Sequence, residues 1–383
     1  MQGVPYWRLS SLYFFYFAAV GVISPYWGVY LDYLGFDGAA IGVIVATPML
    51  TRMLAPNAWG WLADHSGRYL FVIRLGASLS CLAFIGVLFY TQFWPLLLFT
   101  ALFTFFWNAV LPQFEVVTLD ALGANTHFYS RIRLWGSVGF IAAVVLLGFL
   151  FEVISLAWLP WALMSLLVAI SLTTFTLPSH RHSPTKVRGE GIWNTLRSSR
   201  VQYFLAAAFL LHVSHGAFYG FYTLFLMEHN YASSLIGCIW AVGVVAEIIL
   251  FIKVPLILQR YSLWHCYLLS VAAAAVRWLL VGMFVDTVWI MVATQLLHAL
   301  TFGLAHSVAI ETVRQTFHCS NRGKAQAFYS SICFGGGGAV GAYICGALWT
   351  WEPAACFYFA AVAATLATFI TFFGMRPFKR VYA

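Results

Sequence analysis

Charged side chains are scarce in this sequence. Asp, Glu, Lys and Arg make up 8% of its 383 residues, against about 25% in an ordinary soluble domain. Hydrophobic residues make up 62%. This composition excludes a water-soluble globule and predicts a protein that lies in a membrane.

Metal-site, disulfide and cofactor signals are also missing. The seven cysteines form no CxxC pair and most stand in apolar runs, so neither a disulfide framework nor a thiolate metal site is predicted. There is no HExxH motif, no carboxylate pair at a known catalytic spacing and no soluble domain to bind a cofactor. A membrane metalloenzyme with His212, His215, His298 and His306 as ligands is therefore disfavoured. We expect no enzyme activity, no metal and no cofactor.

Long apolar runs follow one another along the whole chain. Each is long enough to cross a hydrocarbon core of about 30 Å as a helix. The first run is too long for a signal peptide and lacks a small-residue cleavage site, so we expect it to remain as helix one. The twelve predicted spans are residues 9–31, 39–62, 70–91, 95–122, 131–151, 156–177, 201–227, 233–258, 262–284, 288–312, 325–349 and 354–375.

The sequence has a net charge of +8, and most of its basic residues stand in the connections between the apolar runs. Lys and Arg occur before the first predicted helix, after the even-numbered helices and at the end of the chain, whereas the odd-to-even connections have neither. By the positive-inside rule, both termini are predicted to be cytoplasmic. The basic excess therefore indicates topology, and no nucleic-acid partner is expected.

The sequence suggests a duplication. A polar stretch rich in Ser, Pro, Gly and basic residues separates six predicted spans from six others, which gives predicted domains at 1–178 and 201–383 and a cytoplasmic linker at 179–200. Phe-Tyr-Ser occurs at 128–130 and again at 328–330, each time before a glycine-bearing helix. We predict an all-α integral membrane protein of two six-helix pseudo-repeats, the common plan of secondary transporters.

Several ionisable residues interrupt the apolar runs. A charged group at the centre of a membrane helix costs about 2.5–3.5 kcal/mol on insertion scales, so such groups face protein or a water-filled cavity. Because an unpaired buried charge is costly, we expect Glu115 to pair with Arg133, and Glu247 to pair with Arg277 and His298. His306 is predicted to face the same cavity.

A polar stripe is predicted on the helix at 201–227. His212, His215, Tyr219 and Tyr222 stand at i, i+3, i+7 and i+10, within one arc of a helix. Such a stripe can line a cavity. A metal is the alternative for His-x-x-His, but the spacing indicates no third or fourth ligand. In the helix at 325–349, Gly337 and Gly341 are predicted to allow close packing on a neighbour.

The segment GWLADHSGR at 60–68 resembles the cytoplasmic loop motif of the major facilitator superfamily, Gly-x-Leu-Ala-Asp-x-x-Gly-Arg. It stands between the second and third predicted helices. The resemblance implies the major facilitator fold. It also implies that Asp64 and Arg68 help to set the conformational equilibrium, while Gly60 and Gly67 provide tight geometry.

The resemblance extends over essentially the whole chain. Within the superfamily, the chain resembles the oligosaccharide/proton symporter branch typified by lactose permease, and it resembles even more the relatives of that branch, the 3-phenylpropionate permeases. The segments that carry it are EVVTLDA (115–121), RIRLWGSVGF (131–140), AEII (246–249), VRWLLVG (276–282) and LLHALTFGLAH (296–306).

The resemblance assigns roles to individual residues. It implies that Glu115 and Arg133 bind substrate and that Glu247 connects substrate to proton. Arg277 and His298 match the arginine and the histidine of the ninth and tenth helices.

Two positions depart from lactose permease. Thr301 stands where that protein has its proton-carrying glutamate, so we expect Glu247, followed by His298, to carry the proton. Phe140 stands where that protein stacks a tryptophan on sugar, which weakens a galactoside as substrate.

These residues predict a proton-coupled symporter for a small organic substrate. An arginine in each half, together with aromatic walls, suits an aromatic carboxylate such as 3-phenylpropionate. A sugar or a nucleoside is the alternative. We expect a monomer in the bacterial inner membrane whose partners are its substrate and lipid, with the proton as coupling ion.

Overall fold

The computed structural model describes residues 5–177 and 192–375. All regular secondary structure in these two ranges is helical. Within them, 12 helices are long and apolar enough to cross a membrane, which confirms the predicted fold class. Residues 179–191 of the predicted linker lie outside the described residues.

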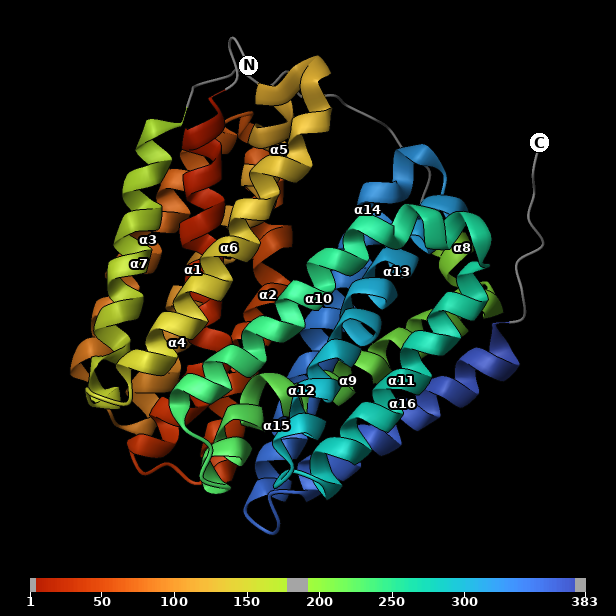
Figure 1. The fold of residues 1–383 in the computed structure, drawn as a ribbon. Helices are drawn as coiled ribbons and strands as arrows, with labels where there is room; N and C mark the ends of the chain where they lie inside the picture. Colours follow the sequence, from red (N-terminus) through yellow and green to blue (C-terminus); the bar gives the residue numbers. More distant parts are fainter. Residues whose placement is uncertain (1–4, 178–191, 376–383) are drawn as a thin grey trace. The chain divides into compact units, whose positions relative to one another are not determined.

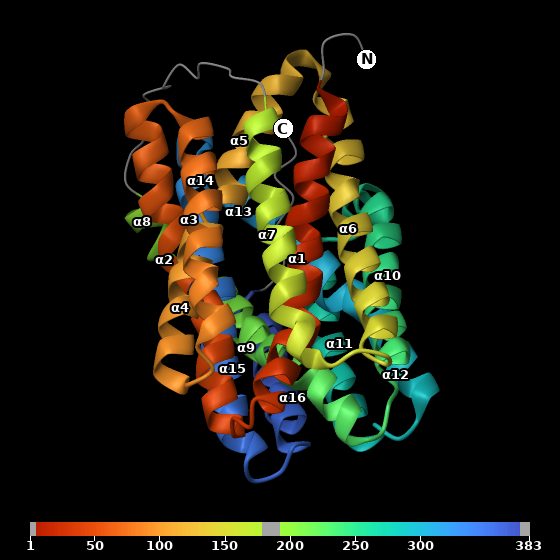
Figure 2. The same ribbon diagram turned by 90° about the vertical axis from the view of Figure 1, so that its left-hand side faces the viewer.

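The first compact unit contains residues 5–177 together with Ala232–Cys238. Within it α1 lies between α6 and α7, and α3 packs against both α4 and α7 (Figure 2). Its helices are α1 (Tyr6–Tyr33), α2 (Gly38–Ser66), α3 (Tyr69–Phe89), α4 (Phe93–Trp107), α5 (Val110–Leu122), η1 (Gly123–Phe128), α6 (Tyr129–Leu150), η2 (Leu156–Trp158) and α7 (Leu159–Thr176).

The second compact unit contains residues 192–231 and 239–375 of the described chain. Here α9 packs against α15 and α16, and α11 packs against α16 and α12 (Figure 1). Its helices are α8 (Trp193–Leu196), α9 (Ser199–Glu228), α10 (Ser233–Arg260, of which residues 233–238 belong to the first unit), α11 (Leu263–Met283), α12 (Val288–His298), η3 (Ala299–Leu304), α13 (Ala305–Thr316), η4 (Cys319–Asn321), α14 (Arg322–Tyr329), η5 (Ser330–Gly337), α15 (Gly338–Trp349) and α16 (Ala355–Gly374).

Each unit contains a very close helix crossing that glycine makes possible. A Cβ on Gly139 of α6 would lie 2.1 Å from the backbone oxygen of Phe14 on α1. A Cβ on Gly341 of α15 would lie 2.1 Å from the backbone oxygen of Val213 on α9. Small residues let membrane helices approach this closely. The close packing expected of Gly341 is confirmed.

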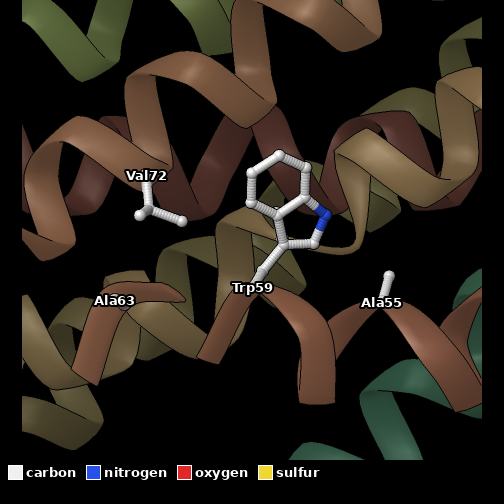
Figure 3. Close-up of a cluster of buried hydrophobic side chains, with 5 residues drawn as sticks. Ala55, Trp59, Ala63 and Val72 are labelled. Carbon is white, nitrogen blue, oxygen red and sulfur yellow. The ribbon is translucent and has the colours of Figure 1, made fainter. Parts of the chain in front are cut away.

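A small hydrophobic cluster around Trp59 packs at the end of α2 that is predicted to face the cytoplasm (Figure 3). Ala55, Trp59 and Ala63 stand four residues apart on one face of α2, and Val72 of α3 faces them. The indole nitrogen of Trp59 donates to the backbone oxygen of Phe105 at 3.3 Å. The alanines leave room for the indole, so this cluster fixes the end of α2 from which the next loop departs.

Three of the predicted continuous spans are interrupted. The fourth is divided between α4 and α5 at Asn108, whose side chain donates to Thr51 Oγ1 at 3.1 Å and to the Pro48 oxygen at 3.4 Å. The tenth and eleventh spans contain the π-helical segments η3 and η5. Such segments are frequent at functional sites, and apolar composition alone does not reveal them.

Candidate functional site

Arg277 lies at the centre of a polar network in the second unit. It stands on α11, and its side chain is fully buried, with 0% exposure. The NH1 group donates to His298 Nδ1 at 3.0 Å and to Thr301 Oγ1 at 3.1 Å, and NH2 donates to Gln295 Oε1 at 3.3 Å. These three partners stand on successive turns of α12 and η3. The tenth span therefore presents one polar face to Arg277.

Two aromatic rings enclose the guanidinium group of Arg277. Its central carbon lies 4.5 Å from the ring centroid of Phe218 on α9 and 4.3 Å from that of Trp278. The Trp278 indole is fixed because its Nε1 donates to Ser214 Oγ at 3.1 Å. Ring faces attract a desolvated cation by about 2 kcal/mol or more. The rings thus hold the cation without neutralising it.

Glu247 joins the network through His298. His298 Nε2 lies 3.7 Å from Glu247 Oε2. The helices approach closely here, since a Cβ on Gly303 would lie 3.2 Å from Glu247 Cγ. The predicted grouping of Glu247, Arg277 and His298 is therefore present, but Arg277 reaches Glu247 by way of the imidazole.

The geometry assigns the tautomer of His298. Arginine has donors only, so the Nδ1 atom that receives Arg277 must be an acceptor. A neutral ring then carries its proton on Nε2, and this nitrogen faces Glu247. A second proton on His298 would break its contact with Arg277.

Further histidines flank this network. The rings of His298, Phe302 and His306 lie nearly parallel, with centroids 5.3 and 6.3 Å apart and interplanar angles of 9° and 9°. The centroid of His215 lies 6.4 Å from that of His298, and the half-buried Tyr219 ring lies 6.3 Å from His215. The predicted stripe and the predicted tenth-span residues thus belong to one aromatic and polar region.

The two histidines on α9 bind their own helix through one nitrogen. His212 Nδ1 and His215 Nδ1 each contact the carbonyl oxygen four residues earlier, at 2.8 and 2.8 Å. Because a carbonyl only accepts, each Nδ1 carries a proton. Among the described residues, His215 Nε2 has no hydrogen-bond partner. Within 5–177 and 192–375, no group of three or more His, Cys, Asp or Glu residues could hold a metal ion.

The first unit holds a second polar region. Glu115 of α5 lies within electrostatic reach of Arg133 and Arg52, and Tyr129 stands close to it. The Arg133 guanidinium lies over the Phe17 ring, 3.9 Å from its centroid. The pairing of Glu115 with Arg133 stays a prediction, because the direct neighbours of the Arg133 guanidinium are the rings of Phe17 and Tyr13.

Phe140 lies on α6 at the crossing with α1. Its backbone oxygen would lie 2.8 Å from a Cβ on Gly21, and its side chain is half-buried. Phe140 and Gly139 therefore both contact α1 at the crossing of α1 and α6 in the first unit.

The loop motif has one residue with a special backbone conformation. Gly67 ends α2 with φ 64°, and its N–H donates to the Ala63 oxygen at 2.8 Å. Asp64 accepts a hydrogen bond from the Tyr69 hydroxyl, and the backbone N–H of Arg68 donates to Ser66 Oγ at 3.3 Å. A Cβ on Gly60 would make an ordinary 3.6 Å contact with Gln113. Tight geometry is therefore found at Gly67 only.

Some residues of these regions were not predicted. Gln295, Phe218 and Trp278 line Arg277, but neutral amides and aromatics inside apolar runs give no strong signal in one sequence. Tyr129 is different, because it belongs to the repeated Phe-Tyr-Ser segment. That repetition was the available signal.

The architecture defines a class of protein. Within the described ranges, twelve helices are able to cross a membrane; the second unit holds a buried arginine and buried histidines, and the first holds arginines near Glu115, as in polytopic helical transporters. Residues 6–360 match the model of the MFS_1 like family. The chain belongs to this family and is a secondary transporter of the major facilitator type.

Individual relatives agree with this assignment. The chain is 30% identical over 377 residues to the "Probable 3-phenylpropionic acid transporter" of Escherichia coli (strain K12), covering 94% of this chain and 96% of the relative. It is 28% identical over 349 residues to "Maltose permease" of Geobacillus stearothermophilus, covering 87% of this chain and 84% of the relative. The solved nucleoside transporter NupG shares the fold, with a TM-score of 0.86, 19% identity, and coverage of 99% of this chain and 100% of that chain.

Proposed function

We propose that this protein is a proton-coupled symporter that takes up a small aromatic carboxylate and binds it at Arg277. One observation carries the proposal. Arg277 is fully buried, and its hydrogen-bond partners among the described residues are neutral: an amide, a hydroxyl and an imidazole. A buried cation is costly until an anion neutralises it. A carboxylate substrate would supply that anion.

The surroundings of Arg277 support an aromatic body on the substrate. Phe218 and Trp278 lie against the guanidinium, and His215 and Phe302 extend the same aromatic region toward Tyr219 and His306. Aromatic rings bind a flat apolar ring by offset or edge contacts. The name of the Escherichia coli relative, a probable 3-phenylpropionic acid transporter, fits this chemistry.

Glu247 is the proposed proton carrier. Thr301 cannot ionise, and it already accepts a hydrogen bond from Arg277. His298 is held neutral by its contact with Arg277, which leaves the carboxylate of Glu247, facing His298 Nε2, to gain and lose a proton. A carboxylate substrate that draws Arg277 away from His298 would free Nδ1 of His298 to take a proton, and Glu247 would then face a charged imidazole. This links proton occupancy to substrate occupancy.

In this proposal the first unit contributes Glu115, Arg133 and Phe140 to the pathway. The loop motif at Asp64 and Arg68 influences the equilibrium between inward-open and outward-open states. The protein works as a monomer in the bacterial inner membrane with cytoplasmic termini, without a cofactor or enzyme activity, and with no nucleic-acid partner.

Uptake by proteoliposomes tests the proposal. With labelled 3-phenylpropionate, the wild-type protein should give saturable uptake that an inward proton gradient drives. Arg277→Lys keeps the charge but loses the fork of donors, so it should weaken both uptake and exchange. Glu247→Gln should abolish gradient-driven uptake while substrate exchange continues. Arg260→Ala, an exposed arginine at the end of α10, is the control and should behave as the wild type.

The same vesicles separate the alternatives. Exchange of 3-phenylpropionate that is unchanged in Arg277→Lys would exclude Arg277 as the carboxylate site. Competition by a sugar or a nucleoside, without competition by aromatic acids, would favour the alternative substrates. One contact supports that alternative: the Gln295 Nε2 donor is buried and has no hydrogen-bond partner in the described part of the chain, so a substrate hydroxyl could accept from it.

A further inference from the structure

A shallow surface cavity of about 660 Å³, largely open to its surroundings, lies at one end of the first unit. It lies where α1 begins and α7 ends, two helices that pack against each other. Its lining residues are Trp7, Arg8, Ser11, Phe175 and Thr176. Glu115 and Arg133 are not among these lining residues.

Two guanidinium groups flank the cavity. Arg8 lines it directly and is exposed. Arg74 of α3 stands over the ring of the lining residue Phe175, 5.4 Å from its centroid. It is anchored there because its Nε donates to the Thr174 oxygen at 3.3 Å. None of the lining residues is acidic, so the cavity presents positive charge.

The hydroxyl groups of the lining are already committed. Ser11 Oγ donates to the Arg8 oxygen at 3.1 Å, and Thr176 Oγ1 donates to the Thr173 oxygen at 2.8 Å. The arginines therefore remain as the charged hydrogen-bond donors for a ligand. Guanidinium groups bind phosphate oxygens with two parallel hydrogen bonds.

Exposed aromatic rings surround these cations. Trp7 is 68% exposed and Phe175 is 59% exposed. The Trp7 ring lies 5.5 Å from that of Trp135, whose Nε1 donates to the Tyr6 hydroxyl at 3.0 Å. Aromatic residues at the ends of membrane helices lie at the level of the lipid head groups. The aromatic rings therefore predict that the cavity lies at the depth of the lipid phosphates.

We infer that this cavity binds the head group of an anionic phospholipid. The guanidinium groups of Arg8 and Arg74 would hold the phosphate, while Trp7 and Phe175 would contact the glycerol and the first acyl carbons. Basic pockets between helices on the cytoplasmic side of a membrane bind such head groups. The positive-inside pattern puts the cavity on that side. The inference does not depend on which substrate the protein carries.

Native mass spectrometry of the purified full-length protein in detergent tests this inference. The protein is titrated with phosphatidylglycerol, with phosphatidylcholine and with glycerol 3-phosphate. We expect tighter binding of phosphatidylglycerol than of phosphatidylcholine. Binding should weaken about fivefold in Arg8→Ala, the effect of one basic side chain near anionic lipid, and more in the double variant Arg8→Ala, Arg74→Gln.

Arg260→Ala is the matched control, because Arg260 is also an exposed arginine beside an aromatic ring, 5.9 Å from the Tyr261 centroid. It should leave binding unchanged. Equal loss in Arg260→Ala, or equal binding of the two lipids, would overturn the inference. So would full competition by glycerol 3-phosphate, which would indicate a site for free phosphate. A thermal melt of each variant verifies that the fold persists, and Arg8→Ala alone suffices if the double variant unfolds.

Discussion

Replacing Gly341 by alanine should destabilise the second unit. The added Cβ would lie 2.1 Å from the Val213 oxygen and 3.1 Å from Gly216 Cα, and both are backbone atoms. Ordinary contact begins at 3.4 Å, so the axes of α9 and α15 must separate by more than an ångström. Overpacking a closed core costs about 1–3 kcal/mol. We expect the upper end, because no side chain can rotate away.

Thermal unfolding of the purified protein in detergent measures this effect. In a unit of this size, a loss of 3 kcal/mol corresponds to a fall of about 6–12 °C in Tm. Gly323→Ala is the control, since a Cβ there meets no atom within 4 Å and alanine favours a helix by up to about 1 kcal/mol over glycine. If Gly341→Ala melted with the wild type, or together with Gly323→Ala, the close crossing would be refuted.

Three further predictions concern other positions. Gly139→Ala should lower Tm as Gly341→Ala does, because its Cβ would lie 2.1 Å from the Phe14 oxygen; an unchanged Tm would contradict this crossing. Trp278→Phe removes a 3.1 Å hydrogen bond to the buried Ser214 and should destabilise by about 1–3 kcal/mol, measured by the same melt, whereas a gain would show that the bond is absent. Gly67→Ala introduces a Cβ at φ 64° and should cost about 1–2 kcal/mol, and a neutral effect would exclude the left-handed conformation.

The spans were predictable because hydropathy and membrane thickness leave few alternatives. Arg277, His298 and Glu247 were predictable because an ionisable group inside an apolar run has no cheap place except a buried network. The resemblance to the major facilitator superfamily is confirmed by the family match. The predictions of the spans and of the buried ionisable residues depend on the free energy of placing each side chain in lipid, which can be judged from one sequence.

The details of the network were not predictable in the same way. Which atom of His298 meets Arg277 depends on the rotation of the tenth span, and η3 changes that rotation locally. Gln295 contributes an oxygen to Arg277, but a neutral amide costs less to bury and is not conspicuous. The division of the fourth span at Asn108 depends on partners 57 and 60 residues away in sequence. Such contacts arise only when the chain has folded.

The π-helical segment η5 has a consequence for the internal duplication. Eleven positions separate Phe128 from Gly139 in the first unit, whereas thirteen separate Phe328 from Gly341 in the second. Both intervals lead from the Phe-Tyr-Ser segment to a glycine at a close crossing. The wider turns of η5 accommodate the two extra residues without moving the crossing. We therefore expect an alignment of the two halves with one fixed offset to lose phase at 330–337, where a gap would restore it.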